Sequence, residues 1–221
     1  MLDGKQVAQV LREQGITQIH HVNTASTAFN YLRHQAIMSR QFVHENPHKY
    51  WQTIQGTDHV DIAHGIFNDI FFDVENIWER SGYNFYGPVV FTFETSILAG
   101  RSINISTDNP THWDTMLHDK RYISDIDDVV INCMSGGAWN FKNHIILPQT
   151  PTIDLSYLNK ITFYIPPHIL PCKDINNPES AANTIAHECE KLDIAFALKT
   201  AKEPTPENKY GLFYGFMMKV I

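Results

Sequence analysis

Residues 18–40 read QIHHVNTASTAFNYLRHQAIMSR and join a short strand pattern to a helix pattern. The histidine pair His20-His21 stands between apolar neighbours, and a polar cluster follows over residues 23–27. Apolar residues then recur at the spacing of an amphipathic helix: Ala28, Tyr31, Leu32 and Ala36. The short side-chain oxygens of the polar cluster can cap that helix by accepting from its first N–H groups. We therefore predict a histidine-bearing strand end beside a helix N-terminus, which suits ribose hydroxyls or phosphate.

The composition is that of an ordinary soluble domain, with 43% hydrophobic and 19% charged residues. A length of 221 residues suits one core, and no repeat or linker divides it, so we expect a single domain over residues 1–221. A net charge of −7 argues against a protein that binds nucleic acid through an extended basic surface. It does not argue against an enzyme that binds one nucleotide in a local cleft. Three widely spaced cysteines suggest neither a disulfide framework nor a zinc site. The sequence shows no signal peptide and no bilayer-length apolar run, so we expect a cytoplasmic protein without membrane contact.

Strand patterns dominate the middle of the chain. The clearest is 89–93, where β-branched and aromatic residues follow Gly87-Pro88. We expect helices at 2–15 and at 183–198, because apolar residues there have helical spacing. This mixture predicts an α+β fold. Further strands are expected at 66–73, 103–105, 143–148, 161–165 and 211–218, a loop with a helical turn or two at 41–65, helix and loop at 113–128, and a hinge at 134–137.

The order of these segments resembles that of the ADP-ribosyltransferase fold. The segments are xxxLxxxxIxS ending at Ser39, IFFD at 70–73, YGPVVFTFETSIL at 86–98, IILP at 145–148 and ITFYI at 161–165. Over residues 19–165 the chain is similar to the DarT-like toxins, which move ADP-ribose from NAD onto nucleic acid. The resemblance implies a split mixed β-sheet core with flanking helices and NAD as co-substrate. It also implies DNA or RNA as acceptor and an antitoxin protein as partner.

The resemblance also implies roles for single residues. The family's first-strand HxT pattern falls on 21–23, so His21 would contact the NAD ribose and Asn23 would replace the threonine. Because neighbouring strand residues face opposite ways, His20 would pack or hydrogen-bond locally. The family's FxPR pattern falls on 72–75, where Glu75 replaces the arginine. Arg40 would hold the pyrophosphate by a bidentate contact, with a plain surface arginine as the alternative. The NAD-binding set is completed by Thr24, Phe72, Asp73 and Tyr31, whose ring could stack on nicotinamide or simply pack in the core.

The family's catalytic glutamate has no counterpart, because its position falls on Asn143 or His144. Breaking the nicotinamide–ribose bond builds positive charge on the sugar, which a nearby carboxylate stabilises. A neutral imidazole can orient a hydroxyl and accept a proton, but it supplies no negative charge. We favour a histidine-based variant in which His144, Asn143 and Arg40 are catalytic. The alternatives are an inactive copy or a carboxylate from elsewhere: Asp73, Glu75 or Glu94.

We therefore expect an NAD-dependent mono-ADP-ribosyltransferase, a toxin of the toxin–antitoxin or phage-defence type that modifies a nucleic-acid base. The missing glutamate motivates a second hypothesis, a catalytically silent binding module of the same fold. The twelve histidines raise a third, metal-dependent catalysis, because His118-Asp119 resembles the HD pair of phosphohydrolases. That family needs further ligands on helices, whereas this chain is rich in strand patterns, so we expect no metal. Other candidate ligands are His59, Asp61 and His64.

Overall fold

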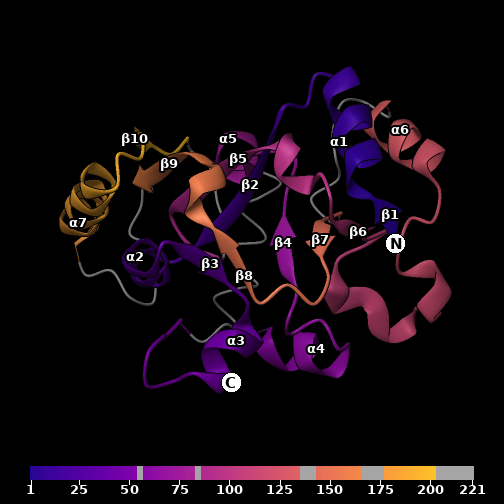
Figure 1. The fold of residues 1–221 in the computed structure, drawn as a ribbon, viewed down its shortest axis with the longest axis horizontal. Helices are drawn as coiled ribbons and strands as arrows, with labels where there is room; N and C mark the ends of the chain where they lie inside the picture. The colour runs from indigo at the N-terminus through magenta and orange to yellow at the C-terminus, as the bar shows by residue number, and fades with distance from the viewer. Residues whose placement is uncertain (54–56, 83–85, 135–142, 166–176, 203–221) are drawn as a thin grey trace.

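A computed structural model describes residues 1–53, 57–82, 86–134, 143–165 and 177–202 of the protein. Its central feature is a β-sheet in two halves, drawn in Figure 1. The first half-sheet has the order β10-β9-β5-β2, and only its β9–β10 pair is parallel. The bounds of its strands are Gln18–Asn23 for β2, Val89–Glu94 for β5, Leu158–Ile165 for β9 and Phe196–Thr200 for β10.

The second half-sheet has the order β1-β6-β7-β4 and is antiparallel throughout. A separate antiparallel pair joins β3 to β8. The bounds are Leu2–Asp3 for β1, Ile70–Phe72 for β4, Ser102–Ile105 for β6, Ile145–Leu147 for β7, Ala36–Met38 for β3 and Thr152–Asp154 for β8.

The two half-sheets meet where β2 passes the end of β4. One antiparallel bridge joins them: the Asp73 N–H donates to the His20 carbonyl at 2.8 Å, and the His20 N–H donates to the Asp73 carbonyl at 2.7 Å. Beyond this bridge the β2 residues that lie nearer Asn23 pair only with β5. The sheet is therefore split beside the predicted histidine strand.

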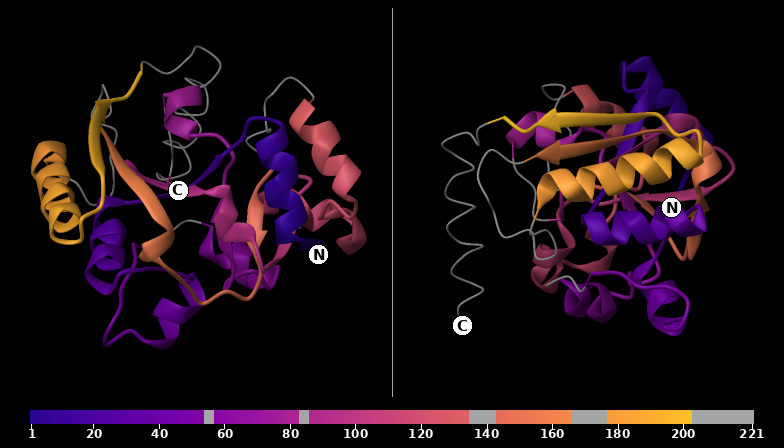
Figure 2. Two further views of the ribbon diagram at one scale, coloured as in Figure 1. Left: turned by 45° about the horizontal axis from the view of Figure 1, so that its top comes forward. Right: turned by 90° about the vertical axis from the view of Figure 1, so that its left-hand side faces the viewer.

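Helices cover both halves. Figure 2 (right) shows α7 running alongside β9 and β10, and α2 packs against α7. The helix α1 packs against α6 beside the second half-sheet, and α3 and α4 lie at the lower edge in Figure 1. The α-helices are α1 Gly4–Glu13, α2 Ala25–His34, α3 Arg40–Glu45, α4 Asp58–Ala63, α5 Ile77–Ser81, α6 Ile126–Met134 and α7 Pro178–Lys191. The 3-10 helices are η1 Thr95–Leu98, η2 Pro110–Thr115, η3 His118–Lys120 and η4 Leu155–Tyr157.

The main core is one cluster that includes residues of both half-sheets and of the helices that pack on them. All inward residues of β5 are buried, among them Phe91 and Phe93, which are fully inaccessible. The apolar spacing in α2 places Ala28, Tyr31 and Leu32 in the same core. In the described ranges, none of the helices combines the length and the apolar character that crossing a bilayer demands.

Several predicted boundaries are wrong. The helix expected at 183–198 ends at Lys191, because Asp193 takes a left-handed φ of 54° and the next residues join β10 in parallel with β9. The strand expected at 66–73 begins only at Ile70, after a turn in which the Asp69 N–H donates to the Ile66 carbonyl. Strands β1, β3 and β8 were not predicted, since two or three residues carry too little periodicity. The strand expected at 211–218 and most of the hinge at 134–137 lie outside the described residues.

Candidate functional site

An open cavity lies at the split between the half-sheets. Its empty volume, open solvent at the mouth included, is about 880 Å³. Strands β2 and β4, the start of α3, the helix α4 and the segment before β7 all contribute to its wall. Six of the sequence-predicted residues line it: His21, Asn23, Tyr31, Arg40, Asp73 and His144.

His21 is held on β2 with its ring toward this cavity. Its Nδ1 lies 2.9 Å from the backbone carbonyl of Phe71 on β4. A carbonyl only accepts, so Nδ1 carries the proton and Nε2 is a hydrogen-bond acceptor. Nε2 is buried and has no partner among the described residues. Burial also lowers the pKa of His21, so the ring stays neutral and Nε2 keeps an unused lone pair.

His20 faces the other side of the sheet, as the strand alternation predicts. Its Nδ1 lies 3.1 Å from the Thr92 hydroxyl on β5. Burial lowers the pKa of His20 to about 4, so the ring is neutral over the physiological range. The role of His20 is local hydrogen bonding, and the histidine pair divides into one structural and one cavity-facing residue.

Asn23 and Tyr31 form one side of the cavity through a buried network. The Asn23 amide donates to the Tyr31 hydroxyl at 3.3 Å, and that hydroxyl donates to the Met38 carbonyl at 3.0 Å. The Gln52 amide donates to the same hydroxyl at 2.8 Å. Burial raises the pKa of Tyr31, so the phenol stays protonated. Tyr31 is 1% exposed, so its core packing is confirmed, although its surface also contributes to the cavity wall.

Asp73 and His144 meet across the cavity wall. His144 Nδ1 lies 2.9 Å from Asp73 Oδ1, although the two residues are 71 positions apart in the chain. Because a carboxylate accepts, Nδ1 carries the proton and Nε2 is left as an acceptor. Asp73 follows β4 and His144 precedes β7, two neighbouring strands of the second half-sheet. The arrangement pairs a carboxylate with an imidazole base in one cavity.

Arg40 lines the cavity at the start of α3, but its guanidinium is engaged. Nε and Nη2 donate to the Asp58 carboxylate at 3.0 and 2.6 Å. Nη1 donates to the Gln52 side chain and to the Thr53 carbonyl at 2.9 and 2.8 Å. One of the five N–H groups is left for a ligand. Arg40 is therefore partly buried and held by an ion pair with Asp58, unlike the plain surface arginine that was the alternative prediction.

Three predicted residues do not line the cavity. Thr24 caps α2, and its hydroxyl lies within hydrogen-bond distance of the Thr53 hydroxyl at 2.9 Å. Phe72 alternates to the opposite face from Phe71 and is 1% exposed in the core. Asn143 donates to the Ser106 carbonyl at 2.8 Å. These three side chains therefore lie behind the residues that line the cavity.

The structure also places in the cavity two aspartates that were not predicted to belong to an NAD site. Asp61 and Asp69 line the cavity, and burial raises their pKa values to about 7 and about 6. The Asp69 carboxylate accepts from the Gln149 N–H at 2.8 Å. The Asp61 carboxylate makes no hydrogen bond or ion pair with any described residue. From the sequence, Asp61 was predicted only as a possible metal ligand. No local sequence signal indicates that α4 lies beside the same cavity as His144.

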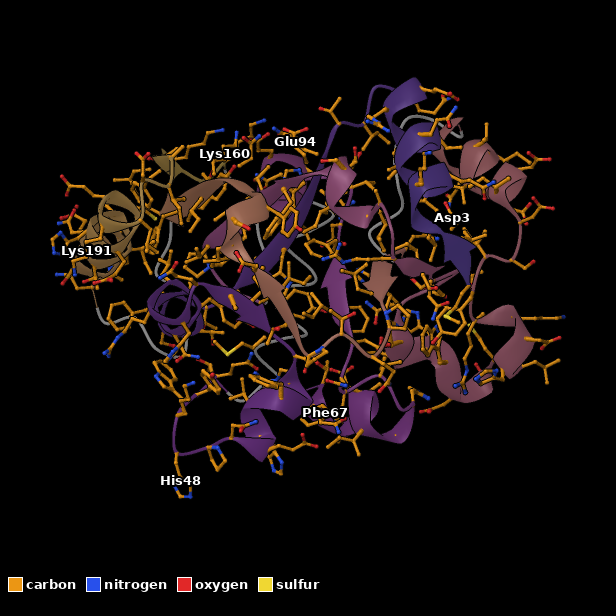
Figure 3. All side chains as sticks on the ribbon, viewed as in Figure 1. Asp3, His48, Phe67, Glu94, Lys160 and Lys191 are labelled. Carbon is orange, nitrogen blue, oxygen red and sulfur yellow. The ribbon has the colours of Figure 1, made fainter. Side chains whose placement is uncertain are left out.

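The other carboxylates and metal candidates lie elsewhere. Glu75 pairs with Arg80 at 3.1 Å. Glu94 pairs in register with the opposite end of β2 from Asn23, and Figure 3 shows its side chain at the outer edge of the molecule. His118 and Asp119 are exposed on η3. Among the described residues, no three His, Cys, Asp or Glu side chains converge as a metal site requires.

The sequence matches no family model and no curated protein. Its structure is similar to that of Thermus sp. 2.9 DarT in complex with ADP-ribosylated ssDNA, with a TM-score of 0.51 and 7% identity over 86% of this chain and 95% of DarT. The complexes of the same DarT with NAD+ and with carba-NAD+ give TM-scores of 0.49, both at 7% identity. They cover 83% and 85% of this chain and 95% and 96% of DarT, respectively. The chain therefore has the predicted α+β, split-sheet fold of the ADP-ribosyltransferases, in the form found in DarT.

Proposed function

We propose that the protein is an NAD-dependent mono-ADP-ribosyltransferase that modifies a nucleic-acid base and acts as a toxin. The observation that carries the proposal is the free, buried Nε2 of His21 at the split of a DarT-like sheet. A neutral imidazole acceptor suits a ribose hydroxyl, which must donate. The Asn23 side chain lines the same cavity, held there by hydrogen bonds to the Tyr31 hydroxyl and the Thr24 N–H.

The charges of the cavity indicate how NAD would lie in it. Arg40 is the one Lys or Arg among the described lining residues, and Asp58 already neutralises most of its charge. Asp61, Asp69 and Asp73 line the same cavity. The pyrophosphate would therefore take the remaining Arg40 N–H, while the uncharged ribose and nicotinamide would occupy the part near His21. When bound, NAD supplies the ADP-ribosyl group that is transferred.

Nucleic acid is the proposed acceptor. The DarT structure at a TM-score of 0.51 contains ADP-ribosylated ssDNA, so this fold can accommodate that kind of product. A net charge of −7 means that such an acceptor would be gripped locally rather than by a global electrostatic field. A toxin of this type would need an antitoxin partner.

The test is transfer of labelled ADP-ribose from NAD to ssDNA, RNA or protein. We expect label on nucleic acid. We expect His21→Ala and His144→Ala each to lower transfer by about 100-fold or more, since His21 would hold the ribose and His144 would accept a proton in the reaction. His187→Ala is the matched control, because His187 is exposed on α7 away from the cavity. The proposal is wrong if wild-type protein labels no acceptor, or if the two cavity variants behave like the control.

A silent binding module is the second candidate, favoured by the absence of a carboxylate at 143–144 and by the engaged Arg40. Calorimetry separates the two. NAD binding without release of nicotinamide, together with tight binding of a protein partner, would favour the module. Turnover of NAD that His21→Ala abolishes would favour the enzyme.

A further inference from the structure

Asp73 and His144 are fixed in the cavity wall by their backbones. The Asp73 backbone exchanges two hydrogen bonds with His20 at the bridge between the half-sheets. The His144 N–H donates to the Ser106 hydroxyl at 2.7 Å, and its carbonyl accepts from the Ser106 N–H at 3.0 Å. Each side chain is therefore positioned independently of the other, as a preorganised site requires.

The contact between the two side chains leaves one free atom on each. His144 Nδ1 donates to Asp73 Oδ1, so His144 Nε2 is a free acceptor. Asp73 Oδ2 accepts no hydrogen bond from any described residue. The side chains are only 10% and 25% exposed, and both line the cavity that holds the His21 imidazole. A base and a negative charge thus face the same space.

We propose that Asp73 and His144 divide the work for which the resembling family uses one glutamate, an inference that rests on the proposed function. The Asp73 carboxylate stabilises the positive charge that builds on the ribose as the C1′–nitrogen bond breaks and its electron pair leaves with nicotinamide. A nitrogen lone pair of the acceptor forms the new bond to C1′. The proton of that N–H passes to His144 Nε2, and the resulting imidazolium is paired with Asp73 before it releases the proton to water.

The division follows from what each group can supply. A neutral imidazole can accept a proton but cannot offset positive charge, whereas a carboxylate brings negative charge to the site. Asp61 is the competing carboxylate in the cavity. Burial and the neighbouring Asp58 raise the pKa of Asp61 to about 7, so about half of the molecules carry no charge there at neutral pH. Asp73 is the better source of fixed charge.

Two activities distinguish the two roles. Release of nicotinamide from NAD without acceptor needs the charge but not the base, because water can lose its proton to solvent after it has bonded to C1′. Transfer to a single-stranded DNA oligonucleotide needs both. The variant Asp73→Asn removes the charge yet keeps an oxygen that can accept from His144 Nδ1. The variant His144→Gln removes the base. Glu75→Gln is the control, because it removes a charge two residues away that faces Arg80.

We expect Asp73→Asn to lower both activities by about 100-fold or more, through kcat rather than the KM for NAD. We expect His144→Gln to lower transfer by about 100-fold and nicotinamide release by less than about tenfold. The ratio of the two activities within one variant does not depend on the fraction of folded protein, so a loss of stability cannot imitate this result. Glu75→Gln should match wild type in both.

The outcomes separate this inference from the proposed function. If wild-type protein neither releases nicotinamide nor labels any acceptor, the proposed function itself fails. If wild-type protein is active but His144→Gln lowers both activities equally, the division of roles is wrong. The same holds if Asp73→Asn retains wild-type rates while Asp61→Asn loses them, which would assign the charge to Asp61.

Discussion

The two half-sheets differ in the length of their strands and in what their ends carry. Strands β2, β5 and β9 of the first half-sheet have six, six and eight residues, whereas β4, β6 and β7 of the second have three, four and three. The long strands bury a continuous apolar face. The short strands end early, so Asp73 and His144 leave the ladder beside the cavity. The candidate site therefore lies where the short strands of the second half-sheet end.

The largest effect should come from a matched pair of phenylalanines. Phe91 in β5 is inaccessible and contacts the rings of His21 and Tyr31, so Phe91→Ala should lower the free energy of unfolding by about 3–5 kcal/mol. Phe71 in β4 is partly exposed at the cavity, so Phe71→Ala should cost about 1–2 kcal/mol. Urea unfolding measures both. Equal losses would contradict the difference in burial between Phe91 and the cavity-side ring of Phe71.

A smaller loss of stability is expected from a substitution at Gly87, in the turn that leads into β5. Gly87 has φ of 131°, and a Cβ there would overlap the carbonyl oxygen of Asn23. Gly87→Ala should cost about 2–4 kcal/mol and also weaken NAD binding, since it displaces a cavity residue. Gly15→Ala is the control, because Gly15 has φ of 80° but open space around it, and should cost about 1 kcal/mol. Thermal unfolding and NAD calorimetry measure both effects. Equal losses of stability in the two variants would contradict the close approach of Gly87 to the Asn23 backbone.

The smallest expected effect on the free energy of unfolding comes from Asp61, one of the aspartates that line the cavity. The pKa of Asp61 is about 7 in the folded protein against 3.8 for the free group, so folding favours its protonated form. That contribution is fully present below about pH 4 and is lost as the pH rises through 7. Asp61→Asn should therefore match wild type at pH 4 and be more stable by about 1–2 kcal/mol at pH 8. A difference between the proteins that is independent of pH would show that Asp61 does not titrate in this way.

The sequence predicted strands in both half-sheets, and its largest error fell on β10 of the first. The β-branched and aromatic run of β5 was predicted almost to its ends, and strand alternation correctly placed His20 and His21 on opposite faces. The helix predicted through residue 198 was wrong, because Phe196 has spacing that suits either α7 or the parallel pairing with Ile161. The two- and three-residue strands β1, β3 and β8 were not predicted, whereas the three-residue strands β4 and β7 were found within longer apolar runs.

The amino-acid sequence by itself determined strands β2 and β5, the capped helix after β2, and the opposite orientations of His20 and His21, because strand alternation and capping are local properties. Tertiary structure alone decided that Asp73 contacts His144, that Asp58 pairs with Arg40 and that Asp61 lines the cavity. Such contacts depend on the register of strands far apart in the chain and on where short loops return, and a shift of one residue would turn each side chain to the other face.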